Sequence, residues 1–140
     1  MYELHDPHKT PEPILVLSGL TYLVPAWAAL QKDRTYDFVT YTFLTFTTTG
    51  FHSTRSDTLF ALDCLAILNF LGRSMYLSTE VDSYARSIYA FSVIYSLTSY
   101  FVGQRYKIMS FHPDWNTQMA YHSLMHLSTA YSAYVLMTQV

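Results

Sequence analysis

The sequence has few charged residues and only one cysteine, and both shortages restrict what the chain can be. Of its 140 residues, 13% are charged, whereas a soluble domain of ordinary composition carries about a quarter. The single cysteine, Cys64, excludes an intrachain disulfide and a cysteine-based zinc knuckle. The formal net charge of −2 leaves no basic patch, so the composition predicts no nucleic acid partner.

Apolar and aromatic residues take the place of the missing charges, at 51% and 17% of the chain. The mean hydropathy of +0.13 is modest because serine, threonine and tyrosine are frequent, but these residues can hydrogen-bond within helices in a membrane. Residues 1–13 read as a polar N-terminal tail, acidic where a cleavable signal peptide would be basic. Residues 14–140 read as a single transmembrane helical domain.

Five apolar segments are each near the length of roughly 20 residues that spans a bilayer. They cover residues 14–30, 38–51, 58–77, 87–103 and 117–140, and the polar stretches 31–37, 78–86 and 104–116 are interpreted as loops, the last of them the longest. The fold class predicted is therefore all-α, an integral, multi-pass membrane bundle of about five transmembrane helices. An organellar inner membrane or an endomembrane is the expected location, and loop charges show no bias that would set the orientation.

Two of the segments contain residues that complicate a simple helix. Pro25 lies inside the first segment, where the missing backbone donor predicts a kink or a packed helix end. Residues 38–51 are rich in threonine and aromatic residues, so that segment alone also fits a β-strand. Its length and its place in a helical series favour a helix.

Alternating spans bring three histidines and one carboxylate to one side of the membrane at similar depth. His52 ends the second segment, Asp63 lies early in the third, and His122 and His126 lie early in the fifth. The i, i+4 spacing of His122 and His126 places both imidazoles on one helical face. With His52 they can form a three-histidine site, and one zinc ion suits such ligands with a fourth position open. Asp63 can then orient a ligand histidine or accept a proton from water at the metal.

Other interpretations of the same residues remain open at this point. The histidine pair can simply hydrogen-bond neighbouring tyrosine or serine side chains, or the histidines can ligate haem. Asp63 can be an ion-pair partner of Arg55 or Arg73. His5, His8 and His112 lie in polar sequence and are interpreted as bystanders, and Cys64 as an inert thiol. The tyrosine-rich fourth segment is interpreted as packing surface and interfacial belt.

The stretches "TTTGFHSTRSDTLFALD" and "YHSLMHLSTAYSAYV" together resemble the alkaline ceramidases, in the superfamily that also holds the adiponectin receptors. That family has a serine four positions before the histidine of an "FH" pair, an aspartate after ten further residues, and HxxxH on its last helix. Here Thr48 replaces the serine, while His52 and Asp63 keep the ten-residue gap. The resemblance covers the second, third and fifth segments. The family has seven helices, and the stretch from His52 to His122 is too short here by about two; the family's acidic N-terminal calcium-binding motif is not evident either.

The resemblance implies zinc held by His52, His122 and His126, with Asp63 near the metal water and the hydrolysis of lipid amides such as ceramide. Two functions follow. The first is a small accessory subunit of a larger membrane complex, derived from such a hydrolase and retaining its zinc site; its partners are other membrane protein subunits and membrane lipids. The alternative is an active zinc-dependent lipid amide hydrolase in which Thr48 helps to stabilise the oxyanion. The short length favours the subunit slightly.

Overall fold

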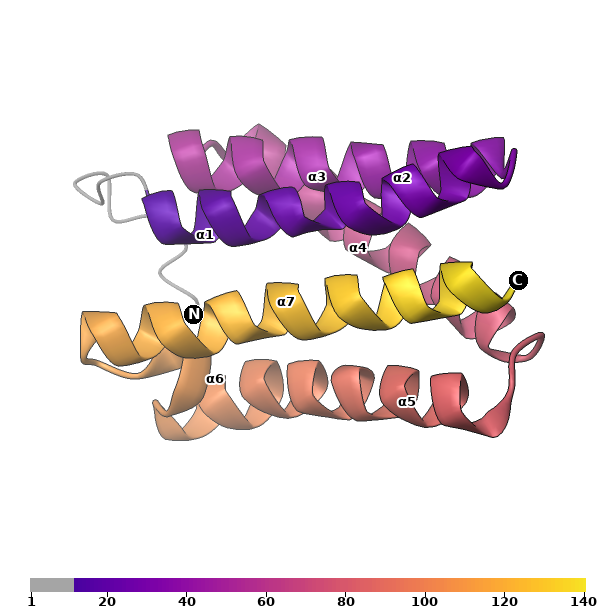
Figure 1. Cartoon of the computed structure of the whole chain (residues 1–140). Helices are drawn as coiled ribbons and strands as arrows, with labels where there is room; N and C mark the ends of the chain where they lie inside the picture. Colours follow the sequence, from indigo (N-terminus) through magenta and orange to yellow (C-terminus); the bar gives the residue numbers. More distant parts are fainter. Residues whose placement is uncertain (1–11) are drawn as a thin grey trace.

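The structure, a computed structural model, describes residues 12–140 and is built from helices, with no strand in that range (Figure 1). Five rods follow one another along the chain. They are α1 and α2 (Pro13–Gly19 and Leu23–Gln31, joined by a 3₁₀ turn), α3 (Thr35–Thr54), α4 (Asp57–Ser78), α5 (Ser83–Leu97) and α7 (Trp115–Gln139). The all-α prediction is confirmed, and the threonine-rich segment is a helix.

The first rod is interrupted one turn before its proline. The 3₁₀ turn spans Leu20–Tyr22 and joins α1 to α2. Pro25 has no N–H to donate to the carbonyl of Thr21, and its ring crowds that carbonyl. The helical hydrogen-bond pattern therefore changes to 3₁₀ in the turn before Pro25, at the segment where the sequence predicted a kink or a packed helix end.

The α3 and α4 helices form an antiparallel pair joined by a short turn. Arg55 ends α3 in the left-handed conformation, with φ of 57°. Asn69 on α4 donates to the Thr40 hydroxyl at 3.1 Å, and Thr47 donates to Asp63 at 3.0 Å, so the two helices run in opposite directions along their contact. This pairing brings the end of α3 beside the start of α4.

Helix α3 begins earlier than the sequence suggested, at Thr35. Asp37 therefore lies in its first turn, where a negative charge complements the helix dipole, and not in the loop that was expected. Helix α5 likewise begins at Ser83, because the Asp82 carboxylate caps it by accepting from the Ala85 N–H at 2.9 Å. The polar residues at both starts were interpreted as loop, although they belong to helix caps and first turns.

The connection before α7 contains more regular structure than the long loop predicted for it. A π-helical turn (Thr98–Val102) follows α5 and leads into α6 (Gly103–Tyr106) and a 3₁₀ turn (Met109–Phe111). The α7 helix then starts after Asp114, whose carboxylate accepts from the Thr117 backbone N–H at 2.8 Å. That hydrogen bond holds the pKa of Asp114 below its usual value.

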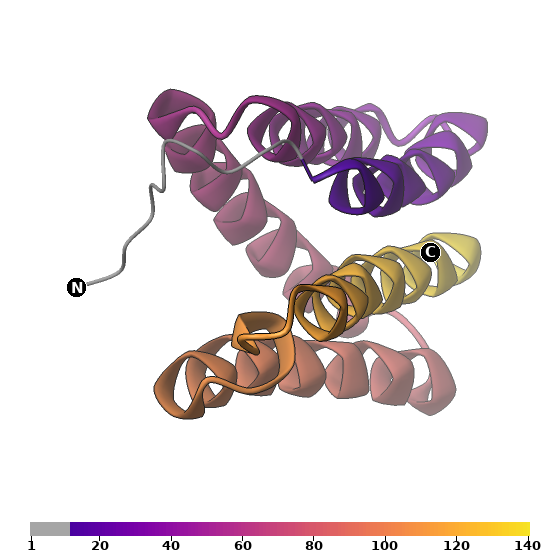
Figure 2. The ribbon, with the colours of Figure 1, turned by 90° about the vertical axis from the view of Figure 1, so that its left-hand side faces the viewer.

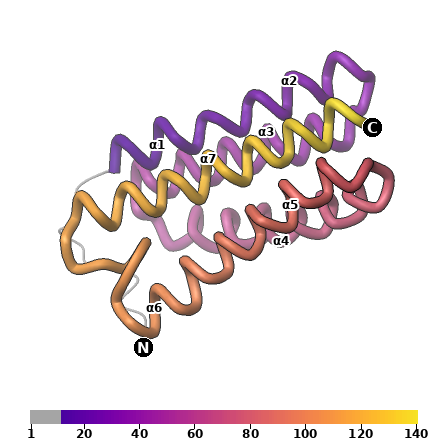
Figure 3. Tube along the Cα trace, turned by 60° about the horizontal axis from the view of Figure 1, so that its bottom comes forward, coloured from indigo at the N-terminus to yellow at the C-terminus, as the bar shows by residue number. Residues whose placement is uncertain are grey.

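Helix α7 lies between the first rod on one side and α5 on the other, whereas α4 crosses the bundle obliquely (Figures 1 and 2). The chain trace shows α7 following α1 and α2 over most of its length (Figure 3). The start of α1 and the end of α7 lie at opposite ends of the bundle, as an odd number of rods requires. Most of the predicted polar tail, residues 1–11, lies outside the described residues.

Two stretches, Pro13–Gln31 and Asp57–Ser78, are long and apolar enough to cross a membrane. Large apolar side chains are exposed on all five rods, not only on those two. They include Leu17, Trp27, Phe46, Leu68, Phe91 and Leu124. The core contains small residues such as Ala26, Ala29 and Ala133, which let the helices approach closely.

Candidate metal centre

The three histidines selected from the sequence come together at one end of the bundle. His52 lies in the last turn of α3, and His122 and His126 lie one turn apart on α7. Their ring centroids are 5.1 Å (His52–His122), 5.4 Å (His52–His126) and 5.0 Å (His122–His126) apart. One potential ligand atom from each lies within 4.8 Å of the others. The predicted convergence is confirmed.

The histidine cluster is enclosed unequally. His52 and His126 are buried, with 2% and 8% of their surface exposed, whereas His122 is only partly buried. Aromatic rings lie on two sides, with the Phe51 ring 5.0 Å from His52 and the Tyr22 ring 6.2 Å from His126. Of the three histidines, His122 is therefore the one with the most exposed surface.

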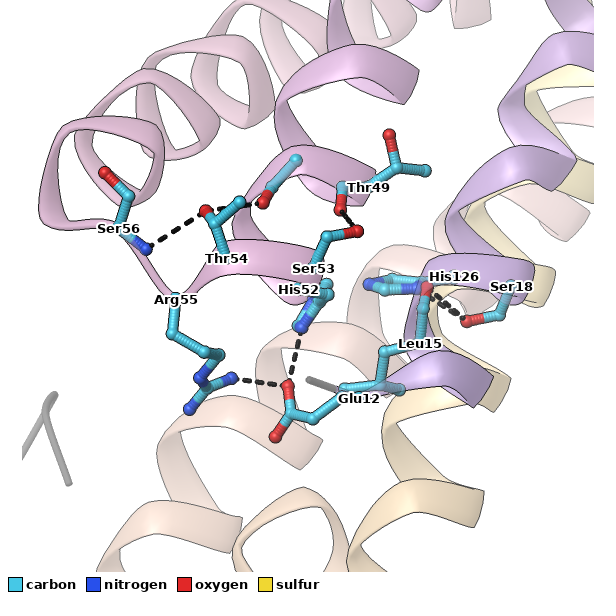
Figure 4. A network of polar contacts seen from close by, with 11 residues as sticks. Glu12, Leu15, Ser18, Thr49, His52, Ser53, Thr54, Arg55, Ser56 and His126 are labelled. Atoms are coloured by element: carbon cyan, nitrogen blue, oxygen red, sulfur yellow. Dashed lines mark hydrogen bonds and ion pairs between the residues drawn. The ribbon is translucent and has the colours of Figure 1, made fainter. Parts of the chain in front are cut away.

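His52 is oriented by a buried carboxylate. Its Nδ1 lies 2.8 Å from Oε2 of Glu12, the residue that precedes α1 (Figure 4). Because a carboxylate can only accept, Nδ1 is the donor, and in the neutral ring the lone pair is then on Nε2. The second nitrogen of His52 is therefore available to a metal ion.

His126 is oriented in the same way by a hydroxyl. Its Nδ1 lies 2.9 Å from Ser18 Oγ, and the Ser18 hydroxyl donates to the carbonyl of Leu15 at 3.2 Å (Figure 4). Since the serine hydrogen is directed at Leu15, the serine lone pair accepts from Nδ1–H of His126. Residues at the start of the first rod thus set the tautomers of two histidines on two other helices.

Arg55 shares the Glu12 carboxylate with His52. Its Nη1 donates to Glu12 Oε2, the same oxygen that accepts from His52. The guanidinium also lies over the Phe51 ring, 5.1 Å from its centroid. Arg55 therefore pairs with Glu12, and the alternative in which it pairs with Asp63 is wrong.

Asp63, on α4, contacts hydroxyls of α3 about one turn before His52. Its Oδ1 accepts from Thr48 at 2.6 Å and from Thr47 at 3.0 Å, and only 7% of the residue is exposed. Arg73 binds Asp37 and not Asp63, so the second ion-pair alternative is also wrong. The Nδ1 partners of His52 and His126 are Glu12 and Ser18 rather than Asp63. The role of Asp63 as a proton acceptor, and that of Thr48 at an oxyanion, stay predictions.

The donor set fits a single zinc ion. Zinc binds imidazole nitrogens at about 2.0–2.1 Å in tetrahedral geometry, which places two such nitrogens roughly 3.3 Å apart. The three nitrogens lie within 4.8 Å of one another, a separation that side-chain rotation would have to shorten to reach that spacing. Three neutral nitrogens with one position left for water are typical of catalytic zinc sites, while structural sites use four protein ligands.

Sequence reasoning missed Glu12 and Ser18, the partners of the ligand histidines. Glu12 was assigned to the polar tail, yet it is 2% exposed. The one available signal was its position directly before the first apolar segment, in "PEPIL". His112 stays outside the cluster, where its Nδ1 accepts from the Asp114 N–H, while His5 and His8 lie outside the described residues. Cys64 is free and partly buried.

Comparisons of the chain with protein-family models, with curated proteins and with solved structures find no match.

Proposed function

We propose that this chain is a multi-pass membrane protein that binds one zinc ion through His52, His122 and His126 and hydrolyses a lipid amide. The observation that carries the proposal is the three-histidine cluster, drawn from two helices that are far apart in the sequence. Unpaired polar groups cost several kcal/mol each in hydrocarbon. One cation satisfies all three lone pairs together.

The surface of all five rods supports a place in the bilayer. Apolar side chains are exposed on each rod, and α3, with 20 residues, is roughly 30 Å long, which matches the hydrocarbon thickness. A hydropathy scale alone underestimates how well α3 suits a bilayer, because it counts the threonines of this helix as polar. Thr45, Thr49 and Thr54 donate to helix carbonyls four residues earlier. Their hydroxyls are thus satisfied without water, and α3 can lie in lipid.

The residues around the cluster support hydrolysis. A bound zinc ion supplies a Lewis acid that activates water at neutral pH. Asp63 is a buried carboxylate on α4 that accepts from Thr47 and from Thr48, which lies one turn before His52 on α3, and in this proposal it accepts a proton from the water. The partial exposure of His122 leaves a side through which a lipid headgroup can approach. The resemblance to the alkaline ceramidases supplies the substrate class.

A second function, an accessory subunit of a larger membrane complex, is favoured by the extent of exposed apolar surface. Trp27, Phe46 and Phe91 are 63%, 66% and 72% exposed, and neighbouring protein subunits can cover them as well as lipid can. In that function zinc holds α3 against α7 and no substrate is turned over. The short stretch between His52 and His122, relative to the ceramidases that the chain resembles, supports the same function.

Purification in mild detergent with metal analysis tests the zinc site. We expect close to one zinc per chain, lost in His126→Ala and kept in the control His112→Ala, which changes a histidine outside the cluster. Wild-type protein without zinc after zinc-supplemented refolding would refute the site.

A ceramide-hydrolysis assay on the same preparations separates the two functions. Zinc-dependent release of fatty acid by the isolated 16.2 kDa chain supports the hydrolase. A zinc-loaded but inactive chain that is recovered only within a much larger complex supports the accessory subunit.

A further inference from the structure

Glu12 is tied to the end of α3 by both its backbone and its side chain. Its N–H donates to the carbonyl of His52 at 3.0 Å, and its own carbonyl accepts from Leu15 and Val16 at 2.9 and 3.0 Å. Its carboxylate accepts from His52 and Arg55. With these contacts fixed and only 2% of its surface exposed, Glu12 holds one orientation relative to His52.

We propose that Glu12 is the positioning residue of the zinc centre and that Arg55 opposes it: the carboxylate directs Nε2 of His52 toward the metal and strengthens it as a donor, while the guanidinium on the same oxygen weakens that effect. This inference rests on the proposed zinc site and assigns regulation of its affinity to a carboxylate–guanidinium pair beside it.

The carboxylate acts through the far nitrogen of the imidazole ring. A histidine that donates to a carboxylate becomes a more basic ligand and is held in one tautomer, and loss of such a partner typically weakens metal binding by about 10–100-fold. Ser18 gives His126 the same tautomer but without negative charge. Glu12 therefore contributes orientation and charge, whereas Ser18 contributes orientation alone.

Arg55 reduces the negative charge that His52 experiences. It donates to the same Oε2 that accepts from His52, so the anionic oxygen is divided between two donors. The guanidinium also brings a positive charge close to a site proposed for a divalent cation, and like charges repel more strongly in a poorly solvated environment. Removing Arg55 relieves both effects.

The proposal therefore predicts opposite changes in zinc affinity for substitutions of Glu12 and Arg55. Structural damage, in contrast, would weaken zinc binding in both variants. The experiment is a competition titration of full-length protein in detergent, with zinc buffered by a chelator, on wild type, Glu12→Gln, Arg55→Gln and Ser18→Ala. Gln keeps an oxygen that accepts from His52 but removes the charge. We expect Glu12→Gln to bind zinc about 10–100-fold more weakly, and Ser18→Ala to lose less than Glu12→Gln.

Arg55→Gln should bind zinc more tightly than wild type, by about threefold or more. The inference is overturned if Glu12→Gln binds within about threefold of wild type, a loss below the range expected for such partners. It is also overturned if Arg55→Gln binds more weakly than wild type. Should Glu12→Gln fail to fold, the sign of the Arg55→Gln change alone decides. If wild type binds no zinc, the proposed function is overturned together with this inference. If all variants bind zinc equally, only this inference is overturned.

Discussion

At the end of the bundle where α3 begins, buried Asp37 is held by two guanidinium groups, whereas at the end where α3 finishes, three imidazoles share one centre. We call these the arginine end (Arg34, Asp37 and Arg73) and the histidine end (Glu12, His52, Arg55, His122 and His126). Both ends place ionisable side chains in the interior of a predominantly apolar bundle. They differ in whether the chain itself supplies all the partners.

At the arginine end the chain itself supplies the cationic partners of the buried Asp37 carboxylate. Arg73 binds Asp37 through Nε at 2.5 Å and Nη2 at 3.0 Å, and Arg34 Nε adds a contact at 2.8 Å. The Arg73 guanidinium also lies 5.4 Å and 5.0 Å from the ring centroids of Tyr36 and Tyr76. A carboxylate that is 1% exposed thus receives three charge-assisted hydrogen bonds.

At the histidine end the described part of the chain supplies partners for the Nδ1 atoms of His52 and His126 but not for their second ring nitrogens. Glu12 and Ser18 bind the Nδ1 atoms of His52 and His126, which directs lone pairs from different helices at a common point. Those lone pairs can accept hydrogen bonds or bind a cation, and His52 and His126 supply no donor to each other in these tautomers. The contrast teaches that a buried polar cluster with its partners built in stabilises the fold, while one with converging lone pairs indicates a ligand.

The largest expected effect on stability lies at the arginine end. Arg73→Met should leave Asp37 buried with Arg34 as its only cation, and removing one member of such a pair destabilises by about 3 kcal/mol. Zinc stoichiometry should be unchanged, because the histidine end is a helix length away. Thermal unfolding in detergent with metal analysis measures both. Arg105→Met, which changes an exposed arginine, is the control; equal destabilisation by the two variants would break the comparison.

A smaller effect is expected at Thr48, which bonds Asp63 at the histidine end. Thr48→Val removes one of two hydroxyls that donate to the carboxylate, and should cost about 1–2 kcal/mol of unfolding free energy. Thr48→Ser keeps the hydroxyl, as in the ceramidase pattern, and should cost less. Chemical denaturation measures the difference. If the valine and serine variants unfold alike, Asp63 does not depend on Thr48.

The smallest effect concerns how closely α1 approaches α3 at the same end. A Cβ on Gly19 would lie 3.1 Å from Cγ2 of Thr48 and 3.2 Å from Cγ2 of Thr49. Gly19→Ala gains helix propensity but must displace these methyl groups, so we expect a net loss of about 1 kcal/mol or less.

The loss should shrink when Thr48→Ser removes one of the methyls, with a coupling energy of about 0.5 kcal/mol or more in a double-mutant cycle. Additive effects would show that Thr48 does not set the spacing of α1 and α3. Because α1 carries Ser18, the single variant should also weaken zinc binding while leaving the arginine end intact.

Local pattern predicted much of this molecule. The threonine-rich stretch was correctly interpreted as a helix, and the segment in which Pro25 predicted a kink or a packed helix end contains a 3₁₀ turn just before that residue. The HxxxH spacing placed His122 and His126 on one face, and alternation of the helices brought His52 to them. These predictions succeeded because helix periodicity and the up-and-down order of antiparallel rods depend on residues near one another in the sequence.

Helix ends and polar partners were predicted poorly. Asp37 was interpreted as loop because its charge interrupts the apolar pattern, although Arg73, far along the chain, neutralises it. Asp63 was given two alternative partners, Arg55 and Arg73, and the structure pairs both arginines with other carboxylates. Charge alone does not identify which of several opposite charges becomes a neighbour.

The sequence by itself therefore determined the helices, their order and the three histidines that share a centre, since these follow from short-range spacing. Only the tertiary structure decided which side chains orient those histidines. Glu12 and His52 are 40 residues apart, and Ser18 and His126 are 108 apart. Such contacts depend on how α1 packs against α3 and α7, and that packing depends on close approaches such as that of the Gly19 backbone to the Thr48 side chain, which no periodicity encodes.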